Sequence, residues 1–167
     1  MTEEMAAKEI PKEMLSLAGE YAVASELCRR GHYAQLTLGT RKKTDILVDT
    51  GTAMLRVQVK SKQGYAWVCS GVFGENIILV LVDYADRQLD QRPDFYILTT
   101  RDWANFLKVP WVKERIAEGT VKIDSENRPI WNSKGKSTFR GFRVEPEEIA
   151  KHKEKWSKIE ALLNKKK

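Results

Sequence analysis

The stretch from Thr44 to Lys62, TDILVDTGTAMLRVQVKSK, constrains the fold more than any other part of the sequence. Residues 44–49 and 54–60 alternate in polarity and are rich in Val, Ile, Leu and Thr, which is typical of half-buried strands. Between them Gly51 precedes Thr52, and a glycine at the first central position suits a two-residue type II′ turn. The stretch therefore predicts a β-hairpin.

The predicted turn also determines which residues face each other. Asp45 faces Gln58 across the hairpin, and Leu47 faces Arg56. Because side chains alternate along a strand, Lys60 lies on the same face as Gln58. A slip of one residue in register would break this cluster of Asp45, Gln58 and Lys60. The alternative is that these side chains are simply the polar outer face of a hairpin.

The first helix is predicted over residues 10–30. Gly31 marks its end, because glycine suits the position just after a helix C-terminus. Glu20 falls within an apolar stripe of this helix, where a carboxylate costs stability unless it is paired or bound to a cation. Alternatively, Glu20 lies at the edge of the stripe and reaches water. Gly19 would let another backbone come close, and Glu26 is predicted to be an ordinary surface charge. The predicted stripe consists of Leu17, Tyr21, Ala24, Leu27 and Cys28.

The rest of the chain alternates between apolar segments and turn residues. The segment 76–83 is apolar almost throughout, which is typical of a strand covered on both faces. Neither internal repeats nor a linker interrupt the 167 residues, so we expect one domain. The predicted strands are 33–38, 76–83 and 94–99, and the predicted helices are about 100–107, 110–118 and 146–164.

The composition limits the class of protein. With 42% hydrophobic and 31% charged residues, the chain is expected to be soluble and globular. No apolar run approaches the roughly 20 residues that span a bilayer, so we expect no membrane association. Two cysteines form neither a disulfide framework nor a zinc site, and the N-terminus lacks the apolar segment of a secretory signal. A cytoplasmic location is therefore expected.

The net charge of +6 favours partners that carry phosphate. Lys42 and Lys43 lie in the loop that enters the hairpin, where contact with phosphate is credible. Residues 120–144 combine basic side chains with Trp131 and Phe139, which could reach a groove or stack a base. The alternative for this segment is a short hairpin that the two aromatic residues pin to the core.

The order of these features resembles the PD-(D/E)XK nuclease superfamily. A helix with Glu20 is followed by a hairpin with Asp45 and the sequence Gln58-Val59-Lys60, and then by two apolar strands with a helix. The small members closest in layout are archaeal-type Holliday junction resolvases and intron-encoded homing endonucleases. The resemblance covers roughly residues 12–100.

The resemblance implies an α/β fold with a restriction-endonuclease-like core, in which a mixed central β-sheet is flanked by helices in the order αβββαβ. It also implies one nuclease-like domain over residues 1–167. The core of this domain would span about residues 10–107, and a C-terminal extension of helices and loops would span about 108–167.

Carried over residue by residue, the resemblance assigns Asp45 as the metal-binding aspartate and Lys60 as the lysine that orients or activates the attacking water. Glu20 resembles the helix glutamate that binds metal directly or through water. Val59 would supply a backbone carbonyl ligand. The predicted metal ligands are therefore Glu20, Asp45, Gln58 and Val59.

The sequence departs from the family pattern at two positions. Gln58 stands where the family usually has Asp or Glu, although Gln also occurs there in some members, and Thr44 stands where the motif name has Pro. The remaining donors are hard oxygen atoms, which suit Mg²⁺ or Mn²⁺. Such an ion would polarise the phosphate and lower the pKa of a bound water.

The sequence thus predicts a Mg²⁺-dependent DNA endonuclease that hydrolyses phosphodiester bonds with metal-activated water. A homodimer or higher oligomer is expected, because two duplex strands need two sites. One alternative is a catalytically inactive, nuclease-like DNA-binding protein, and another is a basic α/β domain whose polar hairpin face binds protein. The predicted catalytic residues are Glu20, Asp45, Gln58 and Lys60, and the predicted DNA contacts are Lys42, Lys43, Thr44, Ser61, Lys62, Lys134, Lys136 and Arg140.

Overall fold

A five-stranded mixed sheet forms the centre of the molecule, with strand order β1-β2-β3-β5-β6. Strand β3 pairs antiparallel with β2 and parallel with β5, and β5 pairs antiparallel with β6. The computed structural model describes residues 9–37, 44–49, 51, 53–131 and 141–164. The strands of this sheet are β1 (Tyr33–Leu36), β2 (Ile46–Asp49), β3 (Met54–Lys62), β5 (Ile77–Asp83) and β6 (Asp94–Thr99).

Two short antiparallel sheets and several helices surround the central sheet. The short sheets pair β4 (Trp67–Cys69) with β9 (Phe142–Val144) and β7 (Val121–Ile123) with β8 (Pro129–Trp131). The helices are α1 (Lys12–Arg29), α2 (Thr100–Phe106), α3 (Pro110–Ala117), the 3₁₀ helix η1 (Pro146–His152) and α4 (Ser157–Asn164). Within the described ranges, none of these helices combines the length and apolar character that a membrane crossing requires.

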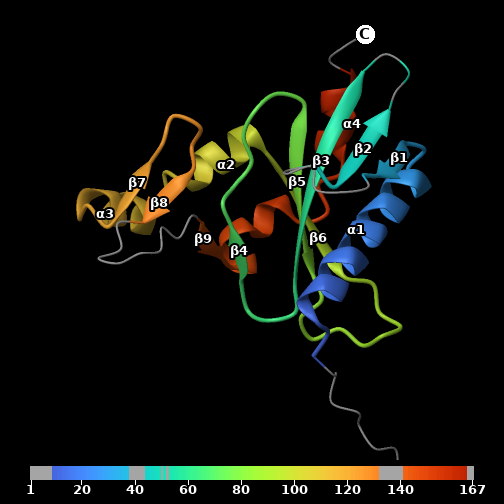
Figure 1. The fold of residues 1–167 in the computed structure, drawn as a ribbon, viewed down its shortest axis with the longest axis horizontal. Coiled ribbons are helices and arrows are strands. Elements are labelled where there is room, and N and C mark those ends of the chain that lie inside the picture. The colour runs from blue at the N-terminus through green and yellow to red at the C-terminus, as the bar shows by residue number, and fades with distance from the viewer. Residues whose placement is uncertain (1–8, 38–43, 50, 52, 132–140, 165–167) are drawn as a thin grey trace, which may run out of the picture.

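The two faces of the central sheet carry separate hydrophobic cores. On one face, α1 and α4 pack through side chains such as Val23, Leu27 and Ile159. On the other face, β4, β9 and α2 contribute Trp67, Phe142 and Trp103. Figure 1 shows α1 at one side of the molecule, and α3 with the β7–β8 hairpin at the opposite end. The sheet therefore lies between two layers.

The predicted strands and the mixed α/β architecture are confirmed, but the predicted order αβββαβ is not. Every residue of β5 is buried, as expected for an apolar run covered on both faces. The connection from β3 to β5, residues 63–76, contains β4 and no helix. Trp67, Cys69 and Val72 in this connection pack directly into the core and cover the face that a crossover helix would otherwise cover.

The buried face of α1 differs from the predicted apolar stripe. Leu17 and Tyr21 of that stripe are 47% and 58% exposed. The helix turns its buried side toward β3 at Gly19, where an added Cβ would lie 1.8 Å from the Ser61 Oγ atom. Close approach at Gly19 was predicted, and it decides which side of the helix faces the sheet. The residues that α1 buries are Leu15, Gly19, Val23, Glu26 and Leu27.

The predicted helix 146–164 is interrupted, and its two halves are η1 and α4. Glu154 between them has a positive φ of 54°, outside the helical range. Its N–H donates to the carbonyl of Phe95 at 2.8 Å, and Lys153 forms a β-bridge with Tyr96. The chain leaves the helix here because these residues pair with the edge of β6.

Candidate functional site

The β2–β3 hairpin has the predicted register. Leu47 pairs with Arg56, and Ile46 pairs with Val57. The backbone N–H of Asp45 donates to the Val57 carbonyl at 2.9 Å, although Val57 is already the partner of Ile46, so the regular ladder ends at Ile46. The pairing of Asp45 with Gln58 stays a prediction.

The carboxylate of Asp45 is oriented by the backbone of β3. The Val59 N–H donates to Asp45 Oδ2 at 2.7 Å. Because the N–H and C=O groups of one strand residue point toward the same edge, the Val59 carbonyl faces the side where Asp45 lies. A carboxylate has about four acceptor positions, so this hydrogen bond leaves capacity for a cation. Asp45 and Val59 thus present oxygen atoms along the same edge of β3.

Glu20 on α1 is within electrostatic range of Asp45 and Lys60. Burial raises the pKa of its carboxyl, and the negative charge of Asp45 raises that pKa further. The positive charge of Lys60 and a hydrogen bond with Ser16 act in the opposite direction and lower it. Side chains from a helix, a loop and a strand are therefore within electrostatic reach of one another.

Gln58 and Lys60 lie two residues apart on β3. Gln58 is buried, whereas Lys60 is exposed. The charge of Lys60 also acts on the thiol of Cys69 in β4, whose pKa burial raises to about 11, while a Gly71 hydrogen bond and Lys60 lower it. The charge of Lys60 thus acts both on Glu20 and on Cys69 of β4, and the residue is exposed to solvent.

The donor chemistry of this group fits Mg²⁺ or Mn²⁺. Glu20 and Asp45 offer two carboxylates, and Gln58 and Val59 offer neutral oxygens, which agrees with the hard oxygen ligands that Mg²⁺ prefers. Burial, and after it the charge of Asp45, raises the pKa of Glu20, and a bound cation would favour the ionised carboxylate. Among the described residues, no cluster of three or more His, Cys, Asp or Glu side chains is arranged for a metal.

Three residues predicted to contact DNA are turned into the protein instead. Thr44 is buried, and its carbonyl accepts a hydrogen bond from the Thr37 hydroxyl at 2.6 Å. The Ser61 Oγ atom is buried beneath Gly19. Lys62 is 5% exposed and pairs with Asp83 at 2.6 Å, because the parallel register of β3 and β5 sets these two side by side. The prediction that the side chains of Thr44, Ser61 and Lys62 contact DNA is therefore wrong.

The remaining predicted DNA contacts lie outside the described residues. They are Lys42, Lys43, Lys134, Lys136 and Arg140. Phe139, predicted to pin the 120–144 segment to the core, lies there as well. Trp131 is described, and its ring packs against Phe142 with ring centroids 5.7 Å apart.

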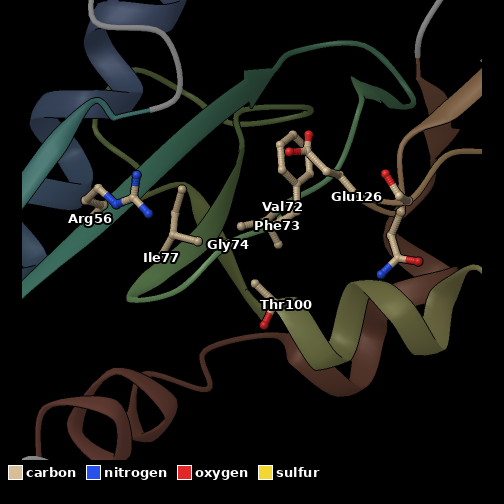
Figure 2. Close-up of a pocket in the computed structure, with 9 residues that line it drawn as sticks. Arg56, Val72, Phe73, Gly74, Ile77, Thr100 and Glu126 are labelled. Atoms are coloured by element: carbon tan, nitrogen blue, oxygen red, sulfur yellow. The ribbon is translucent and has the colours of Figure 1, made fainter.

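A cleft of about 510 Å³ lies away from this group, and the sequence offers no signal for it. Its lining comes from segments far apart in the chain, and Figure 2 shows Arg56, Phe73, Thr100 and Glu126 around it. The Arg56 guanidinium donates to the Glu75 carbonyl at 2.7 Å, which holds it at the rim. None of the predicted metal ligands lines this cleft.

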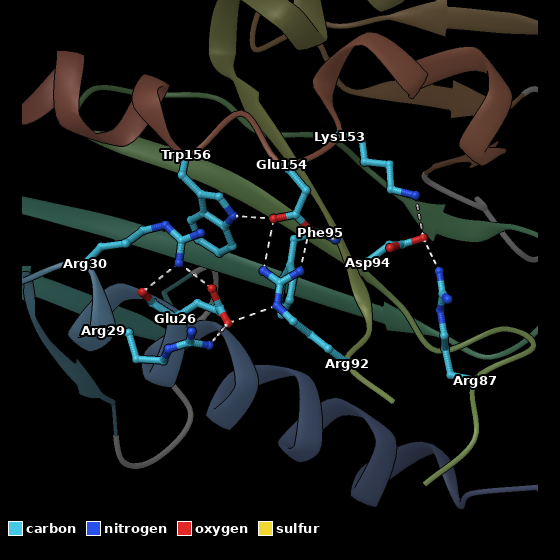
Figure 3. A network of polar contacts seen from close by, with 10 residues as sticks. All are labelled: Glu26, Arg29, Arg30, Arg87, Arg92, Asp94, Phe95, Lys153, Glu154 and Trp156. Atoms are coloured by element: carbon cyan, nitrogen blue, oxygen red, sulfur yellow. Dashed lines mark hydrogen bonds and ion pairs between the residues drawn. The ribbon is translucent and has the colours of Figure 1, made fainter. Parts of the chain in front are cut away.

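A different carboxylate of α1, which is buried, is surrounded by arginines (Figure 3). Glu26, predicted to be a surface charge, accepts from Arg29 at 2.9 Å and from Arg92 at 3.0 Å, and it also pairs with Arg30. Arg92 bridges onward to Glu154 at 2.9 Å. The Arg92 hydrogen bond is the largest influence on Glu26 and holds its pKa at about 2. This network fastens α1 to the C-terminal segment.

Comparisons with known proteins give little more. No protein-family model matches the chain, and no curated protein sequence matches it. Among solved structures, it is similar to the bacterial homing endonuclease I-Ssp6803I, with 17% sequence identity and a TM-score of 0.45. The alignment covers 90% of this chain and 93% of that chain. At this identity and TM-score the similarity assigns neither a fold family nor a function to this chain.

Proposed function

We propose that this chain is a metal-dependent DNA endonuclease that hydrolyses phosphodiester bonds. One observation carries the proposal: the Val59 N–H holds the Asp45 carboxylate against β3 at 2.7 Å, next to Gln58 and the exposed Lys60, and the charges of both Asp45 and Lys60 act on Glu20 of α1. A pair of carboxylates beside an exposed lysine is the combination that binding a divalent cation and a phosphate requires. The basic balance of the chain supports a nucleic acid as the substrate.

Each residue has a distinct role in the proposed reaction. Asp45 and Glu20 would hold Mg²⁺ or Mn²⁺ with help from the oxygens of Gln58 and Val59. When bound, the metal supplies charge that polarises the phosphate and acidifies water. Asp45 is oriented beforehand by its hydrogen bond from the Val59 N–H. The Lys60 amine would donate to the phosphate and to the attacking water, and so stabilise negative charge as it develops.

The raised pKa of Glu20 links metal binding to pH. A carboxyl group must lose its proton before it can bind a cation, so metal affinity rises as the pH passes through the raised pKa. We further propose that the active form contains at least two copies of the chain, because each copy offers one such group and a duplex has two strands.

The test is a nicking assay on supercoiled plasmid with Mg²⁺ or Mn²⁺. The wild type should cut, and both Asp45→Asn and Lys60→Gln should lower the rate by about 100-fold or more. Asp90→Asn and Lys155→Gln change the same charges at exposed positions and should cut like the wild type. An equal loss of nicking rate in the control variants, or an unchanged rate in Asp45→Asn, would contradict the proposed active site.

A second candidate function is DNA binding without catalysis. The observation in its favour is Gln58, which leaves two carboxylates where three acids would bind the metal more tightly. On this alternative the wild type binds plasmid with a strong salt dependence but does not cut plasmid or branched DNA. Gln58→Glu then separates the two candidates, since restoring an acid should restore cleavage to a disabled site but only strengthen metal binding in an active one.

A further inference from the structure

A second, aromatic cleft of about 380 Å³ lies between α3, β8 and β9. We call it the tryptophan cleft, because two of its lining side chains are Trp111 and Trp131. Phe142, Arg115 and Arg143 complete the lining. It lies in the C-terminal third of the chain, beyond the part that carries the proposed metal site.

The aromatic rings of this cleft are held in place. Phe142 is fully buried, and the Trp111 ring packs edge-on against it with centroids 5.2 Å apart. The Trp111 indole N–H donates to Glu148 at 2.7 Å, and the Trp131 indole N–H donates to the Gly141 carbonyl at 2.6 Å. Both indole donors are thus satisfied within the protein, while both rings are still half-exposed. Rigid, partly exposed rings form a stacking surface that loses little side-chain conformational entropy when a ligand binds.

The charges at the cleft favour an anionic ligand. Arg143 hydrogen-bonds to the Tyr65 hydroxyl, and its guanidinium lies 5.6 Å from the centre of that ring. Arg115 pairs with Glu118 at 3.3 Å on the exposed surface. A guanidinium has five N–H donors, so each arginine keeps donors for a phosphate. Glu148, which accepts the hydrogen bond from Trp111, does not line the cleft.

The tryptophan cleft is connected to Lys60 by the β4–β9 ribbon. Cys69 of β4 pairs with Phe142 of β9, and the neighbouring pair is Val68 with Arg143. Lys60 lies within electrostatic range of the Cys69 thiol in this ribbon. Val68 of the ribbon is 56% exposed. A DNA strand that contacts both Lys60 and the cleft would cross the ribbon.

We propose that the tryptophan cleft binds an unstacked base of a single DNA strand, with Arg115 and Arg143 on the flanking phosphates. The inference rests on the proposed function in one respect, that DNA is the ligand. It adds the class of DNA: a substrate with a single-stranded part, such as a branch, a flap or a gap. Base stacking on aromatic rings tolerates any sequence, since every base has a π-face.

The tryptophans themselves provide the measurement. Of the five, Trp67, Trp103 and Trp156 are at most 5% exposed, so quenching by an added oligonucleotide reports on Trp111 and Trp131. An oligo-dT should quench the wild-type fluorescence. Trp131→Ala should weaken oligo-dT binding by about tenfold, whereas Trp131→Phe, which keeps a ring, should lose less.

Two charge variants make the test independent of the tryptophan packing. Arg115→Gln should weaken oligo-dT binding several-fold more than Lys113→Gln, which removes the same charge from an exposed position on the same helix, outside the cleft. Equal effects of the two variants, or binding of oligo-dT without quenching, would overturn the inference. The proposed function is tested separately by the nicking assay. If Asp45→Asn leaves plasmid cleavage intact while oligo-dT binds as expected, the proposed active site is wrong and the proposal for the cleft still holds.

Discussion

Helix α1 carries two acidic residues, Glu20 and Glu26, whose surroundings are opposite. Glu26 is 6% exposed, but three arginines surround it, and its pKa is held at about 2. Glu20 is less buried, yet its pKa is raised, by burial and by the charge of Asp45. Burial acts to raise both pKa values, and at Glu26 the hydrogen bonds and charges of Arg92 and Arg30 outweigh it.

The contrast separates a carboxylate that holds the fold together from one that is suited to a ligand. The protein itself neutralises Glu26, so the residue contributes to stability and needs no further partner. At Glu20 the charge of Asp45 adds to the effect of burial on the pKa, and the charge of Lys60 acts in the opposite direction. Acids with perturbed pKa values are typical of functional sites.

The largest expected effect is on cleavage. Glu20→Gln should lower the rate of plasmid nicking by about 100-fold or more, because it removes one of the two carboxylates proposed to hold the metal. Glu26→Gln should cut at the wild-type rate at a temperature where both variants are folded, as judged by circular dichroism. Comparable losses of nicking rate in Glu20→Gln and Glu26→Gln would contradict the view that only Glu20 takes part in cleavage.

The next effect is on stability. Glu26→Gln should lower the free energy of unfolding by about 2–3 kcal/mol at pH 7, because it leaves arginines inside the network without their carboxylate. Since the pKa of Glu26 is lowered, its contribution is present above the ordinary value of 4.5 and is lost as the pH falls toward about 2. Urea unfolding at pH 7 and at pH 2.5 should therefore show a difference between variant and wild type that shrinks in acid. A difference that is the same at both pH values would contradict this account of Glu26.

A third effect appears on adding Mg²⁺. At ten times the dissociation constant, one bound ion stabilises the native state by about 1.4 kcal/mol. Thermal unfolding should show this stabilisation in the wild type and in Glu26→Gln, but not in Glu20→Gln or Asp45→Asn. Gln58→Glu should bind Mg²⁺ more tightly than the wild type. Equal stabilisation of all these variants would mean that the ion binds elsewhere.

The smallest effect has the opposite sign to that of Glu26. Without metal at pH 7, Glu20→Gln should raise the free energy of unfolding by less than about 1 kcal/mol, since solvent screens this partly exposed group. A raised pKa means that the ionised carboxylate opposes folding, and this cost disappears as the pH falls below the ordinary value of 4.5. Urea unfolding of the variant at pH 7 and at pH 3.5 measures the difference, and destabilisation at pH 7 would contradict it.

Much of the central sheet can be read from the sequence because its determinants are local. The Gly51–Thr52 turn signal and the alternation on either side predict the register that pairs Leu47 with Arg56. The continuous apolar run of β5 predicts a strand buried on both faces. The contact of Asp45 with β3, through the Val59 N–H, lies one residue beyond that regular ladder, so only the structure shows it.

Contacts between distant segments decided the rest. Apolar residues lie on more than one side of α1, so the docked face was settled by Ser61 beneath Gly19 and by Arg92 at Glu26. Lys62 reads as an accessible lysine until the parallel pairing of β3 with β5 brings Asp83 to it. Sequence periodicity describes one element at a time, whereas burial and pKa depend on which charges another element brings within reach.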